Sequence, residues 1–321
     1  MNKVDMQINI GGLEMSNPVT VASGTFAAGK EYQSVWQDMA QANPGLIRNQ
    51  NFPALNTLGA VTTKGVSQIP WTGNDTPRIT ETASGMLNSI GLQNSGVEAF
   101  CAGDLTWLAM QDVPVIVNVC GHALDEYLPV IQRLEQEQAV SAYELNISCP
   151  NVDAGGMAFG IEPALTEEIV SRCRRATQRP LFVKLTPNVT NIVDIAKAAE
   201  AAGANAVSLV NTFTGMAIDA AKQSAVLPRK FGGLSGPAIK PLALYQVFQC
   251  YQAIRIPIIG MGGISTATDA VEFMLAGASA VAIGSANFAD PLTAPKVIDG
   301  IEAYCIEHQI KKASYLTGAL K

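Results

Sequence analysis

The sequence predicts an α/β fold, a (β/α)8 TIM barrel with a short N-terminal β-hairpin and long loops at its C-terminal face. Short apolar or β-branched runs recur eight times, and a segment with helical periodicity follows each, which is typical of parallel βα units. The chain has 321 residues, of which 48% are hydrophobic and 15% charged, enough for a large core. That composition allows one large barrel or two ordinary domains. Eight successive units favour a single domain over residues 1–321.

The expected strands end in small or polar residues: Pro18–Ala22, Leu58–Thr62, Pro114–Val119, Tyr143–Ile147, Leu181–Leu185, Ala206–Val210, Ile256–Gly260 and Ala280–Ile283. The helices between them include Leu165–Thr177, opened by Glu162-Pro163, and Ile192–Ala202, which a glycine cap at Gly203 ends. The first segment, Met6–Met15, predicts a hairpin that turns at Gly11-Gly12 and closes the N-terminal end of the barrel. Residues 63–113 and 211–236 are expected to be long loops.

Charge and cysteine spacing narrow the function classes. The net charge is −6 and no basic run is present, so nucleic acid and anionic membrane surfaces are poor partners. The six cysteines form no CxxC pair, which argues against an iron–sulfur cluster or a zinc site and predicts no metal. The N-terminus lacks a signal-peptide pattern, and no apolar stretch reaches the roughly 20 residues that span a bilayer. We therefore expect a cytoplasmic protein with free thiols.

Glycines at the ends of the last two expected strands predict a phosphate site. Residues 260–264 read GMGGI and residues 284–287 read GSAN, and glycines there let backbone N–H groups surround an anion. The loop at 232–237, GGLSGP, adds a third edge to the same pocket. The alternative is that these glycines only make tight turns. A phosphate here suits either a sugar phosphate substrate or FMN, and the fold does not decide between them.

Cys149 is the candidate catalytic base, because it follows the fourth expected strand at the barrel mouth. A thiol with a pKa of ~8.5 is only partly ionised at neutral pH, so the rate should rise with pH unless the surroundings lower that pKa. The alternative is a buried apolar residue, the role expected for the other five cysteines. The two histidines, His122 and His308, are poorly placed for acid–base chemistry.

Amide side chains and two lysines complete the expected site. Amides match the alternating donors and acceptors of a pyrimidine, and the candidates at strand ends and loops are Asn88, Asn118, Asn146, Asn151 and Asn211. Lys64 and Lys184 each end a mostly apolar run, where an ammonium can neutralise a reduced flavin or a substrate carboxylate. The competing role is a Schiff-base lysine, as in barrel aldolases.

Several motifs together resemble the dihydroorotate dehydrogenases from about residue 5 to about residue 305. They are TTKG (62–65), GMLNSIGLQN (85–94), ELNISCPNV (144–152), GGMAFG (155–160), FVKLTPNVT (182–190), GMAID (215–219), GGLSGPAIKP (232–241) and IIGMGGI (258–264). The resemblance implies FMN across the barrel mouth and oxidation of (S)-dihydroorotate to orotate in pyrimidine biosynthesis. Cys149 would take the C5 proton while the C6 hydride passes to the flavin.

Site residues follow from this resemblance by position. Substrate would be held by Lys64, Asn88, Ser89, Ile90, Gly91, Leu92, Asn146, Asn151, Asn211 and Thr212. FMN would be held by Ser23, Lys64, Gly65, Asn118, Asn146, Lys184, Val210, Gly236, Gly262, Gly263, Gly284 and Ser285, with the glycines around its phosphate.

With a cysteine at position 149, the chain resembles the soluble branch of the dihydroorotate dehydrogenases. Its motifs GGMAFG and GMAID are most similar to those of the catalytic subunit of the NAD-linked class 1B form. That form implies a homodimer joined by an electron-transfer subunit that carries FAD and a [2Fe-2S] cluster, giving a heterotetramer. The alternatives are a fumarate-linked class 1A enzyme and a phosphate-dependent barrel aldolase or isomerase. Residues 41–57 look like an insertion at the bottom of the barrel, which leaves the chemistry intact but bears on assembly.

Overall fold

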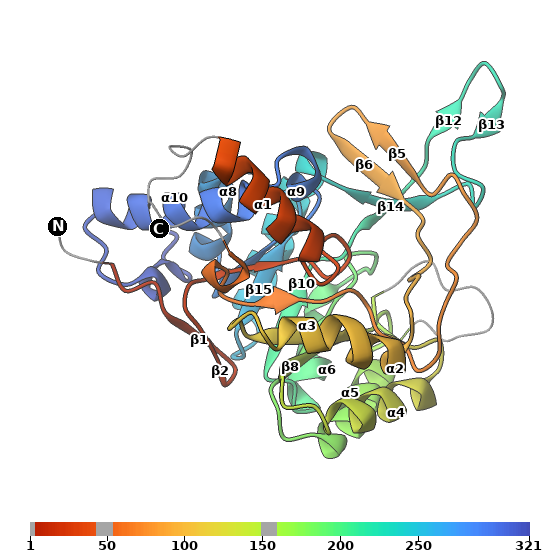
Figure 1. Cartoon of the computed structure of the whole chain (residues 1–321), viewed down its shortest axis with the longest axis horizontal. Coiled ribbons are helices and arrows are strands. Elements are labelled where there is room, and N and C mark those ends of the chain that lie inside the picture. The colour runs from red at the N-terminus through yellow and green to blue at the C-terminus, as the bar shows by residue number, and fades with distance from the viewer. Residues whose placement is uncertain (1–3, 43–53, 149–158) are drawn as a thin grey trace.

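Eight parallel strands form a barrel in the computed structural model, which describes residues 4–42, 54–148 and 159–321 (Figure 1). Their order around the sheet is β3-β16-β15-β10-β9-β8-β7-β4. Their bounds are β3 (Val19–Val21), β4 (Val61–Thr62), β7 (Val115–Val119), β8 (Val140–Asn146), β9 (Leu181–Lys184), β10 (Ala206–Leu209), β15 (Ile258–Met261) and β16 (Ala280–Ile283). Each of the eight predicted strands is confirmed.

The barrel closes between β3 and β4, the two end strands of that order. The N–H group of Gly59 donates to the carbonyl oxygen of Val19 at 2.9 Å. The Thr20 hydroxyl donates to the carbonyl oxygen of Ala60 at 2.9 Å and lies 3.1 Å from the hydroxyl of Thr62. The two strands therefore lie side by side, as the (β/α)8 prediction requires.

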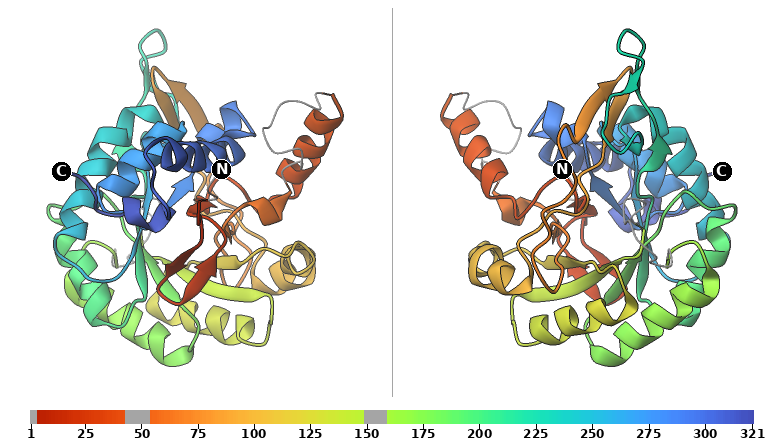
Figure 2. Two further views of the ribbon diagram at one scale, coloured as in Figure 1. Left: turned by 90° about the vertical axis from the view of Figure 1, so that its left-hand side faces the viewer. Right: turned by 90° about the vertical axis from the view of Figure 1, so that its right-hand side faces the viewer.

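Helices surround the strands as an outer ring, which the two views of Figure 2 show along the barrel. The helices are α1 (Lys30–Ala42), α2 (Val97–Phe100), α3 (Thr106–Leu108), α4 (Leu124–Leu134), α5 (Pro163–Ala176), α6 (Ile192–Ala201), α7 (Lys240–Tyr251), α8 (Ala267–Leu275), α9 (Ala286–Ala289) and α10 (Thr293–Glu307). Other helical segments are the 3-10 turns η1 (Leu55–Thr57), η3 (Pro237–Ile239) and η4 (Ala313–Leu316) and the π-helical segment η2 (Cys101–Leu105). In the described parts of the chain, no helix has the length and apolar character needed to cross a membrane.

The capping residues expected from the sequence lie at the ends of α5 and α6. Pro163 is the first residue of α5, where its missing N–H group leaves no bond unmade. The Asn191 side chain accepts from the N–H group of Val193 at the start of α6, and Gly203 follows that helix with a φ of 93°. Both helices are therefore defined by local signals in the sequence.

The N-terminal hairpin closes one end of the barrel, as predicted. Strands β1 (Ile8–Ile10) and β2 (Leu13–Met15) pair antiparallel around Gly11 and Gly12. The side chains at 8, 10, 13 and 15 are buried against inward-facing strand residues that include Ile116, Phe182 and Ile259. One apolar cluster therefore fills the barrel below the strand tips.

The two segments expected as loops form a second sheet, which we call the mouth sheet. Its four antiparallel strands run in the order β11-β14-β6-β5: β11 (Phe213–Gly215), β14 (Gly232–Ser235), β6 (Gly85–Asn88) and β5 (Ile79–Thr82). A further hairpin, β12 (Ile218–Asp219) with β13 (Ser224–Ala225), extends from it. Figure 1 shows this group at the end of the barrel opposite β1 and β2. The loop prediction was wrong here, because backbone pairing between distant segments orders both.

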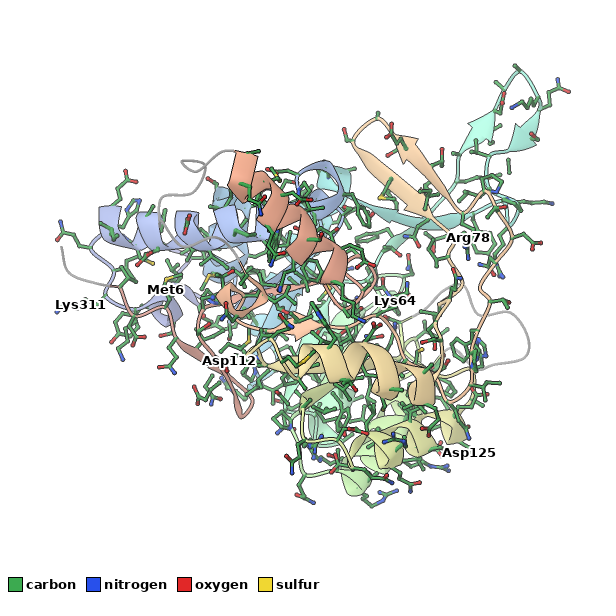
Figure 3. The ribbon with its side chains drawn as sticks, in the orientation of Figure 1. Met6, Lys64, Arg78, Asp112, Asp125 and Lys311 are labelled. Atoms are coloured by element: carbon green, nitrogen blue, oxygen red, sulfur yellow. The ribbon has the colours of Figure 1, made fainter. Side chains whose placement is uncertain are left out.

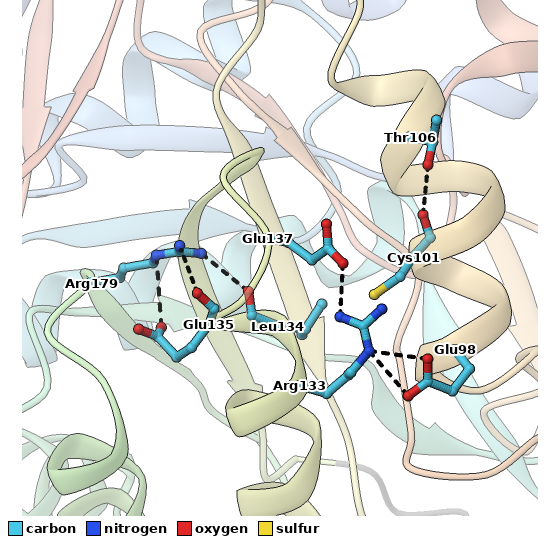
Figure 4. A network of polar contacts seen from close by, with 8 residues as sticks. All are labelled: Glu98, Cys101, Thr106, Arg133, Leu134, Glu135, Glu137 and Arg179. Carbon is cyan, nitrogen blue, oxygen red and sulfur yellow. Dashed lines mark hydrogen bonds and ion pairs between the residues drawn. The ribbon is translucent and has the colours of Figure 1, made fainter.

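A polar cluster joins α4 to α2 on the outer surface (Figure 4). Arg133 Nε donates to Glu98 Oε2 at 3.0 Å and Arg133 Nη1 to Glu137 Oε1 at 2.7 Å. Cys101 lies beside this cluster, and burial raises the pKa of its thiol although the nearby arginine opposes the shift. Cys101, Cys120, Cys173, Cys250 and Cys305 are all buried, so the apolar role predicted for them fits their positions.

Candidate active site

A cavity of about 220 Å³ lies between the C-terminal ends of the barrel strands and the mouth sheet. Most of the sequence-predicted site residues that the structure describes line its wall: Ser23, Lys64, Asn88, Ile90, Gly91, Leu92, Asn146, Lys184, Val210, Asn211, Thr212, Gly236, Gly262, Gly263, Gly284 and Ser285. They come from segments more than 250 positions apart, and the barrel brings them together because all eight strands end on this face.

Three predicted residues lie behind the wall. Ser89 is buried, and its hydroxyl contacts the Asn74 amide at 3.2 Å. Gly65 packs against Asn118, which is fully buried, and a Cβ atom added to Gly65 would lie 3.1 Å from Asn118 Oδ1. The predicted base Cys149 and the predicted ligand Asn151 lie outside the described residues, as do 43–53 of the expected insertion.

A chain of buried polar side chains runs along β7 and β8 to the cavity. Asn118 Nδ2 donates to Glu144 Oε1 at 2.7 Å, and Asn146 Nδ2 donates to Asn118 Oδ1 at 3.3 Å. Ser148 Oγ donates to Asn146 Oδ1 at 3.0 Å and accepts from Asn211 Nδ2 at 2.8 Å. Because Asn118 turns its Nδ2 group to Glu144, its Oδ1 atom is left to accept from Asn146, and the same direction continues through Ser148 to Asn211.

Sequence reasoning missed Glu144 and Ser148, although a signal for the first was present. Side chains alternate between the two faces of a strand, so Glu144 shares the inward face of β8 with Ala142 and Asn146. A carboxylate on the inner face of a barrel strand needs a buried partner. That requirement points to Asn118 on the neighbouring strand, where Asn118 and Glu144 are register partners.

Lys184 places a buried ammonium under the cavity. Its Nζ donates to the Ser23 hydroxyl at 3.1 Å across the barrel, and the two residues are 5% and 3% exposed. Within the described residues Lys184 makes no ion pair. A desolvated cation with a neutral partner costs free energy, and a negatively charged ligand would offset that cost. Lys64, which is labelled in Figure 3, lies two residues after β4 and also lines the cavity.

Two glycine loops form one side of the cavity. Gly262 and Gly263 follow β15 with φ values of 124° and 79°, a region in which side chains other than glycine are strained. Gly284 and Ser285 follow β16. In the described parts of the chain, no hydrogen-bond acceptor is present for the backbone N–H groups of Gly263, Ile264, Gly284 and Ser285. Unpaired N–H groups beside helix starts are the usual site of a phosphate group.

Much of the remaining wall is apolar. Met261 and Ile264 belong to the predicted phosphate loop, whereas sequence reasoning missed the other apolar residues: Ile79, Met86, Ile239 and Phe288. Such surfaces suit a flat ring system with few polar edges. His122 lies elsewhere and stacks on Trp71, with ring centroids 3.7 Å apart.

Comparison with known proteins identifies the family. The family model described as dihydroorotate dehydrogenase matches residues 5–305. Two curated relatives, each named dihydroorotate dehydrogenase B (NAD(+)), catalytic subunit, come from Alkaliphilus metalliredigens and Lachnoclostridium phytofermentans. The first is 49% identical over 320 residues, and the alignment covers 100% of both chains. The second is 49% identical over 318 residues, and the alignment covers 99% of this chain and 100% of the relative.

A solved structure supports the fold. The crystal structure of a dihydroorotate dehydrogenase from Eimeria tenella in complex with ferulenol has a TM-score of 0.78 at 22% identity. The match covers 98% of this chain and 88% of that one. With its barrel, its cavity at the strand ends and its full-length relatives, this chain belongs to the dihydroorotate dehydrogenase family.

Proposed function

We propose that this chain is the catalytic subunit of an NAD-linked dihydroorotate dehydrogenase. It would oxidise (S)-dihydroorotate to orotate in pyrimidine biosynthesis, with FMN in the cavity at the barrel mouth. The observation that carries the proposal is the cavity itself. Two glycine loops, whose N–H groups have no acceptor among the described residues, and the buried ammonium of Lys184 line one space. The names of the full-length relatives support the same activity.

The described residues fit FMN in three respects. The N–H groups of Gly263, Ile264, Gly284 and Ser285 lack acceptors in the described parts of the chain, and phosphate oxygens would supply them. Lys184 would offset negative charge on the ring system, with Ser23 fixing its position. The apolar wall residues would pack against the rings, and Gly236 and Val210 also line the space. Bound FMN would supply the hydride acceptor.

The other chemistry belongs to the chain. We propose that Cys149 removes the C5 proton of the substrate, since it directly follows Ser148, whose hydroxyl lies in the buried polar chain next to the cavity. Amides at Asn88, Asn146 and Asn211 would bind the pyrimidine edges, because amides both donate and accept. Lys64 would neutralise the substrate carboxylate. The segment after Ser148 would complete the site with Asn151.

The relatives' names contain the words catalytic subunit, which imply a separate partner. We propose that electrons pass from FMN to a partner subunit with FAD and a [2Fe-2S] cluster and then to NAD. Two copies of this chain would join two such partners in a heterotetramer. The cytoplasmic location and the single-domain organisation stay predictions.

Anaerobic mixing with dihydroorotate tests this function. The purified protein should be yellow, and the visible flavin band should disappear on mixing. Cys149→Ala should retain FMN but slow this reduction by roughly 10²-fold or more, as expected when a general base is lost. Cys149→Ser should be slowed less at high pH, and Cys250→Ala, at a buried site, should react normally.

Two outcomes would contradict the proposal. Near-normal reduction in Cys149→Ala would remove this residue from the mechanism. A colourless protein that binds no FMN would instead favour a phosphate-dependent aldolase or isomerase, which uses the same glycine loops.

A further inference from the structure

An ion-pair cluster lies directly behind the glycine loop that follows β15. Lys240 is the first residue of α7, and its Nζ contacts Asp269 Oδ1 at 2.6 Å and Glu272 Oε2 at 2.8 Å on α8. The Asp269 side chain is 14% exposed, so this ion pair is shielded from solvent better than an ordinary surface pair. None of the three residues belongs to the cavity wall.

Asp269 also holds the downstream half of the loop. Its second oxygen, Oδ2, accepts from the N–H groups of Ser265 at 2.9 Å and Thr266 at 2.8 Å. The Thr266 hydroxyl in turn accepts from the N–H group of Asp269 at 3.2 Å, which completes a capping box at the start of α8. Burial alone would raise the pKa of the Asp269 carboxyl, but the hydrogen bonds from Lys240, Ser265 and Thr266 hold that pKa below its ordinary value.

Lys240 contacts the upstream half of the loop with its backbone. A Cβ atom added to Gly263 would lie 2.9 Å from the Lys240 nitrogen, 2.9 Å from its Cβ, and 2.8 Å from the carbonyl oxygen of Gly236. Lys240 therefore packs against Gly263 and, through Asp269, is linked to Ser265 and Thr266. The N–H groups of Gly263 and Ile264, which have no acceptor within residues 4–42, 54–148 and 159–321, lie between these two contacts.

We propose that Lys240 and Asp269 are positioning residues that hold the loop at 262–266 in its phosphate-binding conformation before the ligand arrives. This inference rests on the proposed function, because FMN supplies the phosphate. A loop held in place loses less conformational entropy on binding, so its N–H groups bind phosphate oxygens more tightly. The effect should be confined to ligands that carry the phosphate.

Riboflavin provides the discriminating comparison, since it has the same rings as FMN and no phosphate. Dissociation constants for both are measured by fluorescence titration of flavin-free protein. In Lys240→Met and in Asp269→Asn, FMN affinity should fall about tenfold, the scale of losing a hydrogen bond to a charged group. Riboflavin affinity should change less than about threefold. Lys240→Arg should keep most of the FMN affinity.

Glu272→Gln is the matched control, because Glu272 pairs with Lys240 while the hydrogen bonds from Ser265 and Thr266 go to Asp269. Its ratio of FMN to riboflavin affinity should equal that of the unmodified protein. Thermal unfolding of each flavin-free variant verifies that it is folded, and Asp269→Asn provides the test if Lys240→Met does not fold.

Equal losses for FMN and riboflavin, or an unchanged ratio in a folded Lys240 or Asp269 variant, would show that the cluster only joins α7 to α8 and would overturn the inference. Failure of the unmodified protein to bind either flavin would instead overturn the proposed function.

Discussion

Replacing Lys184 with methionine should raise the stability of the flavin-free protein and lower its affinity for flavin. Lys184 is 5% exposed, and its ammonium has the Ser23 hydroxyl as its hydrogen-bond partner at 3.1 Å. A methionine keeps most of the apolar stem and removes the charge. The two effects have opposite signs because the ammonium is costly in the empty protein and favourable beside an anionic ring system.

The expected magnitudes follow from the burial of this group. Replacing the charged side chains of a buried ion pair with apolar ones of similar volume is often neutral or stabilises proteins by about 1–4 kcal/mol, because the charges no longer have to be desolvated. Lys184 makes one neutral hydrogen bond among the described residues, which offsets part of its desolvation cost. We therefore expect a gain of about 1–3 kcal/mol and a Tm higher by several degrees. Loss of a hydrogen bond between charged groups costs about 1.5–3 kcal/mol, which is roughly a 10- to 100-fold weaker flavin complex.

Thermal unfolding of flavin-free protein and fluorescence titration with FMN measure the two quantities. Lys296→Met is the matched control, since Lys296 is 53% exposed and pairs with Asp290 on the surface. That change should alter both quantities by less than about 0.5 kcal/mol. A less stable flavin-free Lys184→Met protein would refute the reasoning, because it would mean that the folded chain already compensates the charge.

Three further changes test other parts of the structure. Glu144→Gln introduces a hydrogen-bond donor at the start of the buried polar chain, so kcat/KM for dihydroorotate should fall roughly tenfold. An unchanged kcat/KM in steady-state kinetics would contradict the idea that Glu144 orients the side chains of this chain. Burial raises the pKa of Cys173 and of Cys250 to about 12. Iodoacetamide at neutral pH should therefore modify Cys149 far faster than either of these thiols, which peptide mass spectrometry would measure. Comparable modification rates for the three cysteines would contradict this prediction. Ile10→Ala, at a fully buried hairpin position, should destabilise the protein by about 2–5 kcal/mol in chemical denaturation, and a loss under about 0.5 kcal/mol would argue against the hairpin as a closure of the barrel.

The barrel could be predicted because each of its units carries local signals. Pro163 and Gly203 mark helix ends at the expected positions, and the strands between helices are short apolar runs. The mouth sheet could not be predicted in this way. Asn88 and Gly233 are register partners although 145 positions separate them, and Gly232–Ser235 shows no alternation of apolar and polar residues. That pairing depends on the barrel bringing both segments to one face.

The site was predictable where residues follow strand ends, as with Gly263, Ser285 and Lys184, because a barrel gathers all strand ends at one face. Site residues were harder to predict where their place in the wall depends on the mouth sheet or on how deep in the barrel their side chain lies. Met86 reaches the cavity from β6, and Asn118 lies beneath the wall instead of within it. Strand position alone does not distinguish a side chain in the wall from one in the layer below.

A crystal structure of the protein with FMN and orotate tests the central claim most directly. We predict that the phosphate accepts hydrogen bonds from the backbone N–H groups of Gly263 and Ser285, that Lys184 contacts the flavin ring, and that the Cys149 sulfur faces the pyrimidine. A phosphate bound away from both glycine loops, or a Cys149 thiol turned away from the pyrimidine, would contradict the account.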